Sequence, residues 1–186
     1  TLTRLFRFSF LQQIESSFGP SPGEARRTKK HDVQKERVRD SLAVFDYGDR
    51  QVTYTETDPN DPMRPPRRIA SEVRPGTFDM ISGIYWLRTK PLAVGSTFDM
   101  TVSDSGLVYK VPVKVTARER QKTEIGKVWC WRVEPQVFGP GRLIEREGSM
   151  IIWITDDARR IPVRSQVNSS IGRFEIKIQS VQNLKV

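Results

Sequence analysis

The stretch that decides the fold is "MIIWITDDARRIPVRSQV", residues 150–167. In it, Asp156, Asp157, Arg159 and Arg160 lie between two apolar runs. Apolar runs bounded by a compact polar segment are typical of two strands joined by a turn. In such a turn the carboxylates accept hydrogen bonds, and the arginines answer them. The same charges could also form a small catalytic or metal-binding cluster, so the segment predicts a hairpin and raises the question of its chemistry.

Two residues beside this turn add architectural detail. Trp153 is expected to anchor the incoming strand in the core. Pro162 has no N–H to give a neighbouring strand, so it predicts a bulge or an unpaired side of the ladder just past the turn.

Outward from this hairpin, the dominant pattern is alternation with a period of two residues, the mark of half-buried strands. One hairpin is expected around "DYGD", residues 46–49, where Gly48 is placed to adopt positive φ. Further strand patterns follow the same rule and lie in residues 96–102, 107–117, 127–133, 147–154 and 173–181. Strands that pair mainly with their sequence neighbours favour an antiparallel meander.

One segment has a helical pattern instead, "TFDMISGIYWLRT", residues 77–89. Asp79 can cap its first turn together with Ser82, three residues further on. Met80, Ile84 and Leu87 form an apolar stripe. The sequence therefore predicts a mainly β fold: a curved antiparallel meander sheet, half-barrel or barrel-like, with one short α-helix, about Asp79 to Arg88, packed on or in it.

The 186 residues predict a single β-rich domain, residues 1–186. The chain begins inside the strand-like pattern "TLTRLFRFSF", from which we expect that either a leader or N-terminal strands of the fold have been removed. Residues 58–76 carry prolines throughout and predict a long loop rich in proline and arginine. No apolar run reaches the roughly 18 residues that a transmembrane helix needs.

Charge is the second informative feature. The formal net charge is +9 and the pI about 10.0, which favours an anionic partner. The basic residues gather in residues 26–39 and 64–74, which resemble loops or strand ends. No nucleic-acid-binding motif accompanies them. Two interpretations stay open: a solvated basic surface, or contact with an anionic surface such as lipid through Arg64, Arg67, Arg68 and Arg74.

Few residues offer catalytic or metal chemistry. Cys130 is the only cysteine and lies between two tryptophans in an apolar strand, where a buried small side chain is expected. His31 is the only histidine and has no plausible triad around it in the sequence. A carboxylate pair of Asp79 with Asp156 or Asp157 lacks an accompanying nucleophile, and the adjacent arginines would repel a cation. We expect no catalytic site, no metal and no cofactor.

Several segments together resemble a known family. They are "FDMISGIYWLRTKPLAVGSTFDMTV", "YKVPVKVTARERQKTEIGKVWCWRVEP", "MIIWITDDARRIPVRSQV" and "IGRFEIKIQSV". Their order is similar to that of the bacterial family called domain of unknown function 3108, whose members are mostly exported β-rich proteins. The resemblance implies a periplasmic or cell-envelope location and brings no established activity. The family pattern falls on Asp79, Ser82, Tyr85, Arg88, Gly95, Gly126, Trp153, Asp156, Asp157, Arg160, Pro162 and Val163.

Three hypotheses about function follow. The first is a non-enzymatic envelope protein that binds an apolar or amphiphilic ligand, or a lipidated partner, on its concave face. The second is a structural or assembly module that contacts other envelope proteins through a sheet edge or the loop at 58–76. The third is an unrecognised hydrolase or lyase built on the carboxylates and Tyr85. The residues favour them in this order, because the family positions already have structural reasons to exist.

Overall fold

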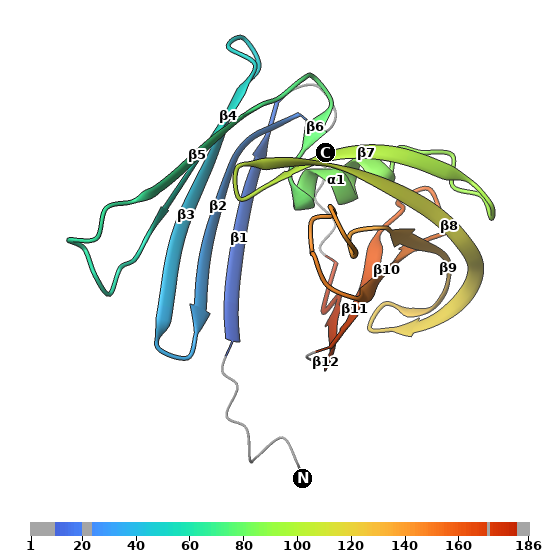
Figure 1. Cartoon of the computed structure of the whole chain (residues 1–186). Coiled ribbons are helices and arrows are strands. Elements are labelled where there is room, and N and C mark those ends of the chain that lie inside the picture. The colour runs from blue at the N-terminus through green and yellow to red at the C-terminus, as the bar shows by residue number, and fades with distance from the viewer. Residues whose placement is uncertain (1–9, 20–23, 171, 182–186) are drawn as a thin grey trace. The chain divides into compact units, whose positions relative to one another are not determined.

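The computed structural model describes residues 10–19, 24–170 and 172–181 (Figure 1). The sequence predicts one domain, and the described residues group into two compact units. The first unit comprises the described residues up to Gly83 together with Val102–Val108. The second comprises Ile84–Thr101 and the described residues from Tyr109 onward. Each unit is considered separately below.

The first unit is built on a five-stranded antiparallel sheet in which each strand pairs with its sequence neighbour, in the order β1-β2-β3-β4-β5. Its strands are β1 (Phe10–Phe18), β2 (Ala25–Gln34), β3 (Arg37–Asp46), β4 (Gln51–Thr57) and β5 (Arg67–Glu72). The basic segment 26–39, expected to be loops or strand ends, therefore lies mostly within β2 and β3. Neighbour pairing of this kind is what the period-two pattern predicts.

The other strands form a seven-stranded sheet in the order β12-β11-β10-β9-β8-β7-β6. They are β6 (Thr77–Phe78), β7 (Thr97–Asp104), β8 (Leu107–Thr123), β9 (Gly126–Pro135), β10 (Gly148–Thr155), β11 (Pro162–Ser169) and β12 (Gly172–Lys177). The long strand β8 bends strongly along its course (Figure 1). A register shift between Val115 and Ala117 accompanies the bend, because an extra residue in one strand increases local curvature.

The single described helix, α1 (Met80–Leu87), is shorter than the segment 77–89 that the sequence predicts. Thr77 and Phe78 form β6 instead, and Asp79 is the residue before the first helical turn. At the other end, the N–H of Lys90 donates to the carbonyl of Leu87 over 3.1 Å. This tighter i→i+3 bond closes the helix just before Pro91, which cannot continue it.

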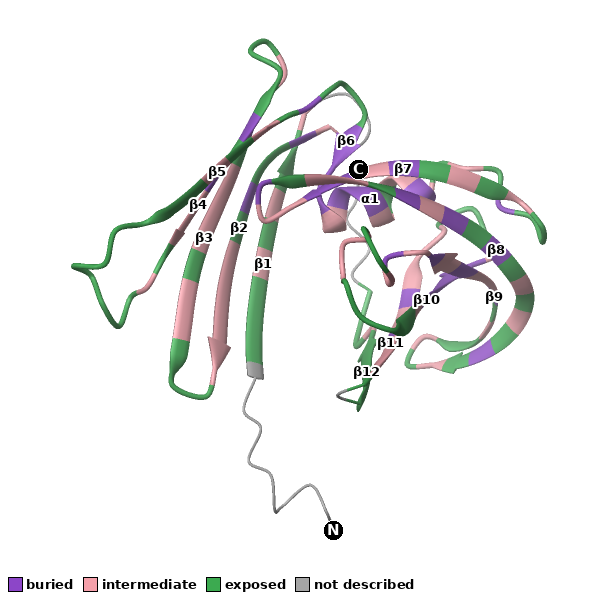
Figure 2. Cartoon of the chain, in the orientation of Figure 1, coloured by how far each residue is buried: buried purple, intermediate pink, exposed green. Residues whose placement is uncertain are grey.

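The first unit has its core at one end of the five-stranded sheet. Ala25, Phe45, Val52 and Val73 are buried together there. The Tyr47 hydroxyl lies 2.9 Å from the carbonyl oxygens of both Ala25 and Thr77, and its single proton can serve one of them at a time. Burial, reinforced by nearby Glu24 and Asp79, raises the pKa of Tyr47 to about 12. The half of the sheet nearest the β2–β3 turn has no buried residue among those described (Figure 2). That half is therefore a single layer within this unit.

The second unit is packed more evenly. Every residue of the β10 run Ile151–Thr155 is buried, as expected of a strand covered on both faces (Figure 2). On one face, Ile151 and Trp153 pack with Cys130 of β9 and Val163 of β11. This cluster is the interior that the quoted stretch helps to build.

Two local predictions are wrong. Residues 58–76 are not one loop, because β5 lies within them. The prolines of this segment lie before and after β5, so they remove no hydrogen bond from it. β5 is at the end of its sheet and pairs with β4 alone. The loop is therefore limited to residues 58–66. In the turn at 46–49, positive φ falls on Arg50 at 52° and not on Gly48.

The predicted fold class is confirmed: the chain is mainly β, the strand pairs whose register is described are antiparallel, and the described residues contain one short helix. The strands form two sheets rather than the one meander sheet that the sequence predicts.

Candidate functional site

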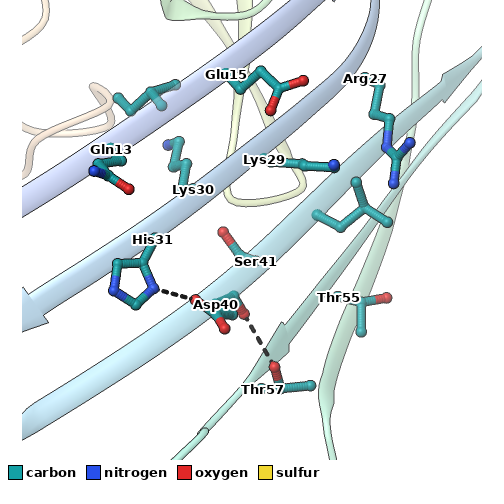
Figure 3. Close-up of a pocket in the computed structure, with 12 residues that line it drawn as sticks. Gln13, Glu15, Arg27, Lys29, Lys30, His31, Asp40, Ser41, Thr55 and Thr57 are labelled. Atoms are coloured by element: carbon teal, nitrogen blue, oxygen red, sulfur yellow. Dashed lines mark hydrogen bonds and ion pairs between the residues drawn. The ribbon is translucent and has the colours of Figure 1, made fainter.

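A groove of about 670 Å³ lies on the five-stranded sheet and is the candidate site (Figure 3). Cross-strand pairing places two rows of side chains in it, one residue from each of β1 to β4. The rows are Gln13–His31–Asp40–Thr57 and Glu15–Lys29–Leu42–Thr55. Paired residues of an antiparallel sheet share a face, so both rows point to the same side. Arg27 adds a further cation to the lining.

The face that carries these rows is the uncovered one. No described residue of the rows is buried. Leu11, 51% exposed, and Val44, 44% exposed, lie on the same face by register. A solvated sheet face is normally polar, whereas this one mixes exposed aliphatic side chains with charged ones. The groove is therefore amphiphilic.

Charges in the groove are only partly neutralised. His31 Nδ1 lies 2.6 Å from Asp40 Oδ1, and the Thr57 hydroxyl donates to the Asp40 carbonyl (Figure 3). Among the described residues, Arg27 and Lys29 have no carboxylate oxygen within the 4.0 Å of an ion pair. Glu15 lies opposite Lys29 on the neighbouring strand and offsets part of this charge. The groove therefore offers cationic groups beside an aliphatic floor.

Sequence reasoning missed this site. Residues 26–39 place polar side chains on both faces of the sheet. The apolar alternation that identifies a strand in a sequence is therefore missing. One feature of the sequence could have revealed the hairpin: a short turn at residues 35–36 between two segments of equal length. A hairpin about this turn pairs His31 with Asp40 and Lys29 with Leu42.

The predicted Asp79 and Ser82 form a buried helix cap in the first unit. Asp79 Oδ1 accepts from the Ser82 N–H at 2.7 Å, and Ser82 Oγ accepts from the Asp79 N–H at 2.8 Å. The hydroxyls of Ser16 and Thr28 donate to Asp79 Oδ2, so the same carboxylate joins the helix to strands β1 and β2. Asp79 is 2% exposed and all its neighbours donate to it. Its role is architectural.

Asp157 organises the charged turn of the quoted stretch. Its Oδ1 accepts from the N–H groups of Arg159 and Arg160, each at 3.0 Å, and its Oδ2 from the Arg159 side chain. Burial opposes ionisation, but hydrogen bonds from Thr155 and Arg159 outweigh it and hold the pKa of Asp157 below its ordinary value. The carboxylate serves the turn, as expected.

The same turn is tied to the end of the helix in the second unit. Arg88 Nη2 donates to the carbonyl of Arg159 at 2.7 Å, and the Arg160 side chain donates to the carbonyl of Lys90. Cations at a helix C-terminus satisfy free carbonyls and complement the dipole. The Arg160 side chain therefore caps the helix, and only the Arg160 backbone N–H bonds a carboxylate of the turn. The expectation that its side chain pairs with Asp156 or Asp157 is wrong.

The other residues around the hairpin take separate partners. Asp156 Oδ2 accepts from Arg118 Nε of β8 at 2.6 Å, outside the turn. The Trp153 indole donates to Glu119, and the guanidinium of Arg164 lies 4.6 Å from the centre of its ring. The register shift opposite Pro162 is the predicted bulge, and it turns Val163 into the core.

Of the remaining family positions, two are glycines in turns and one is an exposed tyrosine. Gly95 and Gly126 have φ of 88° and 107° in the turns expected for them. Tyr85 is 50% exposed, with the Arg88 guanidinium 5.0 Å from its ring centre, so its ring is not buried against a sheet.

The four arginines expected to face an anionic surface are exposed in the first unit. Arg64 approaches Asp58 at 3.9 Å and Arg74 approaches Glu72 at 3.7 Å. Arg67 and Arg68 are adjacent on β5 and therefore point to opposite faces. The structure does not gather the four into one patch.

Cys130 is expected to be inert towards thiol reagents until the second unit unfolds. The side chain is fully buried, and burial, together with the charges of Asp157 and Glu119, raises the pKa of the thiol to about 11. The reactive thiolate is therefore scarce at neutral pH. The measurement is the rate of Ellman's reagent with and without urea. A fast reaction of the native protein would contradict the buried placement.

Within the described ranges, no group of three or more His, Cys, Asp or Glu residues is arranged to hold a metal ion. No helix in the same ranges is long and apolar enough to cross a membrane.

Comparison with known proteins gives one match. The model of the family described as "Protein of unknown function (DUF3108)" matches residues 2–179, nearly the whole chain, which confirms the resemblance. No curated protein and no solved structure matches the chain.

Proposed function

The chain belongs to the DUF3108 family of proteins of unknown function, and we propose that it is a non-enzymatic protein of the cell envelope that binds an amphiphilic ligand with an anionic head group in the groove of the five-stranded sheet. The groove is the observation that carries the proposal. The envelope location rests on the family resemblance, whose members are mostly exported.

The size and lining of the groove suit such a ligand. Small-molecule sites typically measure about 300–1,000 Å³ and combine an apolar wall with a few polar groups, and the groove measures about 670 Å³. Lys29 and Arg27 would bind the anionic head, since charge-assisted hydrogen bonds are among the stronger polar contacts. Leu42 and the methyl groups of Thr55 and Thr57 would contact an acyl chain.

The engagement of the carboxylates supports binding rather than catalysis. The Asp79 carboxylate accepts three hydrogen bonds, from the Ser16 and Thr28 hydroxyls and from the Ser82 N–H, and so serves as helix cap and sheet anchor. Asp157 is saturated by its turn, and Asp156 is ion-paired with Arg118. None of the three lines the groove. The hydrolase hypothesis therefore loses the groups on which it depended.

A second candidate is an assembly role through a sheet edge. Strand β12 lies at the end of the seven-stranded sheet, where Phe174 is 41% and Ile176 73% exposed. An exposed apolar edge strand is suited to pair with another chain. A stoichiometric protein partner on the chain prepared from its own envelope would favour this role over ligand binding.

The test of the groove is native mass spectrometry of the full chain titrated with lysophosphatidylglycerol, an anionic single-chain lipid. We expect saturable binding that Lys29→Glu weakens about tenfold or more, because one charge-assisted contact is worth about 1.5–3 kcal/mol. Leu42→Asp should weaken binding by a similar factor, because it removes the apolar contact with the acyl chain. Both residues are on the uncovered face, so both variants should fold.

The matched control is Lys110→Glu, the same charge change on an exposed residue of β8 outside the groove. It should bind as the unaltered chain does. Equal affinities of Lys29→Glu and Lys110→Glu would refute the groove as the binding site. Equal binding of the zwitterionic lysophosphatidylcholine would refute the anionic head group.

A further inference from the structure

A second surface gathers tryptophans and cations on one face of the β8–β9 hairpin, in the second unit. Cross-strand pairing sets Arg118 opposite Trp131, Arg120 opposite Trp129, and Lys122 opposite Lys127. Paired residues of an antiparallel ladder share a face, and so do residues two apart along a strand. These six residues therefore form one two-strand array, here called the tryptophan–cation patch.

The patch is held in place by stacking and one ion pair. The guanidinium carbons of Arg118 and Arg120 lie 4.5 Å and 5.3 Å from the ring centre of Trp129. Arg118 also lies 5.9 Å from the ring centre of Trp131, and its Nε is 2.6 Å from Asp156. Asp156 thus orients the arginine that stacks on Trp129.

Most of its charge has no counterpart. Among the described residues, no carboxylate oxygen lies within 4.0 Å of a side-chain nitrogen of Arg120, Lys122 or Lys127. All three are exposed, and Trp129 keeps 42% of its surface exposed. Like charges side by side repel, and an exposed indole gives up the stabilisation of burial. The arrangement is therefore unfavourable for the isolated chain.

The two tryptophans of the patch differ in burial. The opposite face of the hairpin carries Val128 and Cys130, which pack with Trp153 in the interior of the second unit. On the patch face, Trp131 is half-buried and lies opposite the fully buried Ile154 of β10. Trp129 is therefore the exposed indole of the patch.

We propose that the tryptophan–cation patch docks the protein on an anionic membrane surface. A flat array of cations complements a flat array of lipid phosphates, and an indole as exposed as that of Trp129 favours the boundary between head groups and acyl chains. Guanidinium groups already lie near both tryptophan rings, which disfavours stacking of a sugar or a base on them. The patch lies in the other unit from the groove, so this proposal does not depend on the proposed ligand.

The test is sedimentation of the full chain with vesicles of equal parts phosphatidylcholine and phosphatidylglycerol, and with vesicles of phosphatidylcholine alone. Binding should require phosphatidylglycerol and weaken steeply between low salt and about 0.15 M, where charges are screened over about 8 Å. Arg120→Glu/Lys122→Glu should reduce the partition coefficient by roughly 30-fold or more, at about fivefold for each cation. Trp129→Thr, which leaves the charge unchanged, should reduce it several-fold.

The control is Arg67→Glu/Arg68→Glu, an equal change of charge on exposed residues of β5. Its binding should fall much less than that of the patch variant. Unchanged far-UV circular dichroism should accompany each variant, since the altered residues are exposed. Equal loss in the two double variants would reduce the effect to net charge and overturn the proposal. Binding to heparin through the patch with none to vesicles would overturn it too, in favour of a soluble polyanion.

Discussion

Asp79→Ala is expected to lower the free energy of unfolding by about 3 kcal/mol, whereas Ser82→Ala is expected to cost only about 1 kcal/mol. Both substitutions remove one bond of the helix cap. Asp79→Ala also leaves the hydroxyls of Ser16 and Thr28 without the carboxylate they donate to. Thr28 is 5% exposed, so water reaches its hydroxyl poorly. A buried hydroxyl without a partner costs about 1–3 kcal/mol.

Urea unfolding followed by far-UV circular dichroism measures both variants. The tryptophans all lie in the second unit, so their fluorescence would report the first unit poorly. The double variant Ser16→Ala/Thr28→Val removes the two donors and keeps the cap. It should cost more than Ser82→Ala, because it leaves the buried Oδ2 of Asp79 without either donor. If Asp79→Ala were no more destabilising than Ser82→Ala, Asp79 would be a helix cap and nothing more.

Asp79 also shows where sequence reasoning ends. The spacing of Asp79 and Ser82 predicts the cap, because the two residues of a capping box lie only three positions apart in the sequence. Ser16 and Thr28 are 63 and 51 residues away and reach Asp79 only through the pairing of β1 with β2. No local pattern encodes that meeting. Local chemistry was predictable, and its long-range partners were not.

The hairpin of the quoted stretch follows the same division. That Asp157 serves the turn and that Pro162 marks a bulge follow from the backbone chemistry of acidic residues and proline. The partners of Asp156 and Arg160 are Arg118 and Lys90, far along the chain. Only the fold brings them together. What resembled a reactive cluster is a turn whose charges are divided among three separate contacts.

The two proposed surfaces escaped the sequence for another physical reason. A strand is recognised by an apolar face, and the segment that holds Lys29 and His31 has none, because no described residue in that half of the sheet is buried. In β9 the apolar pattern was evident, and it predicted burial for Cys130 without assigning a face to the tryptophans on either side. The side chains of both tryptophans lie on the face opposite to that of Cys130, because successive side chains of a strand point to opposite faces. Trp129 remains exposed as a result.

Gly106→Ala is the second large effect we expect, a loss of about 3 kcal/mol against about 1 kcal/mol for Gly95→Ala. Both glycines have positive φ, 81° and 88°, which costs any other residue about 1–2 kcal/mol. They differ in their surroundings. A Cβ at Gly106 would lie 2.6 Å from Cβ of Tyr54 and 2.9 Å from Cβ of Ile69, whereas nothing lies within 4 Å of one at Gly95.

Because φ is nearly equal in the two turns, the difference between the variants isolates the steric term. The atoms that a Cβ at Gly106 would meet are the rigid first carbons of Tyr54 on β4 and Ile69 on β5, so the β7–β8 turn must move off the sheet. Overpacking of this kind costs about 1–3 kcal/mol beyond the strain in φ. Thermal unfolding followed by circular dichroism gives the comparison. The double variant Gly106→Ala/Ile69→Ala should cost less than the two single losses added together, because Ile69→Ala removes Cγ2, which would lie 3.0 Å from the new methyl group. Equal stability of the Gly106→Ala and Gly95→Ala proteins would mean that the turn does not rest against β4 and β5.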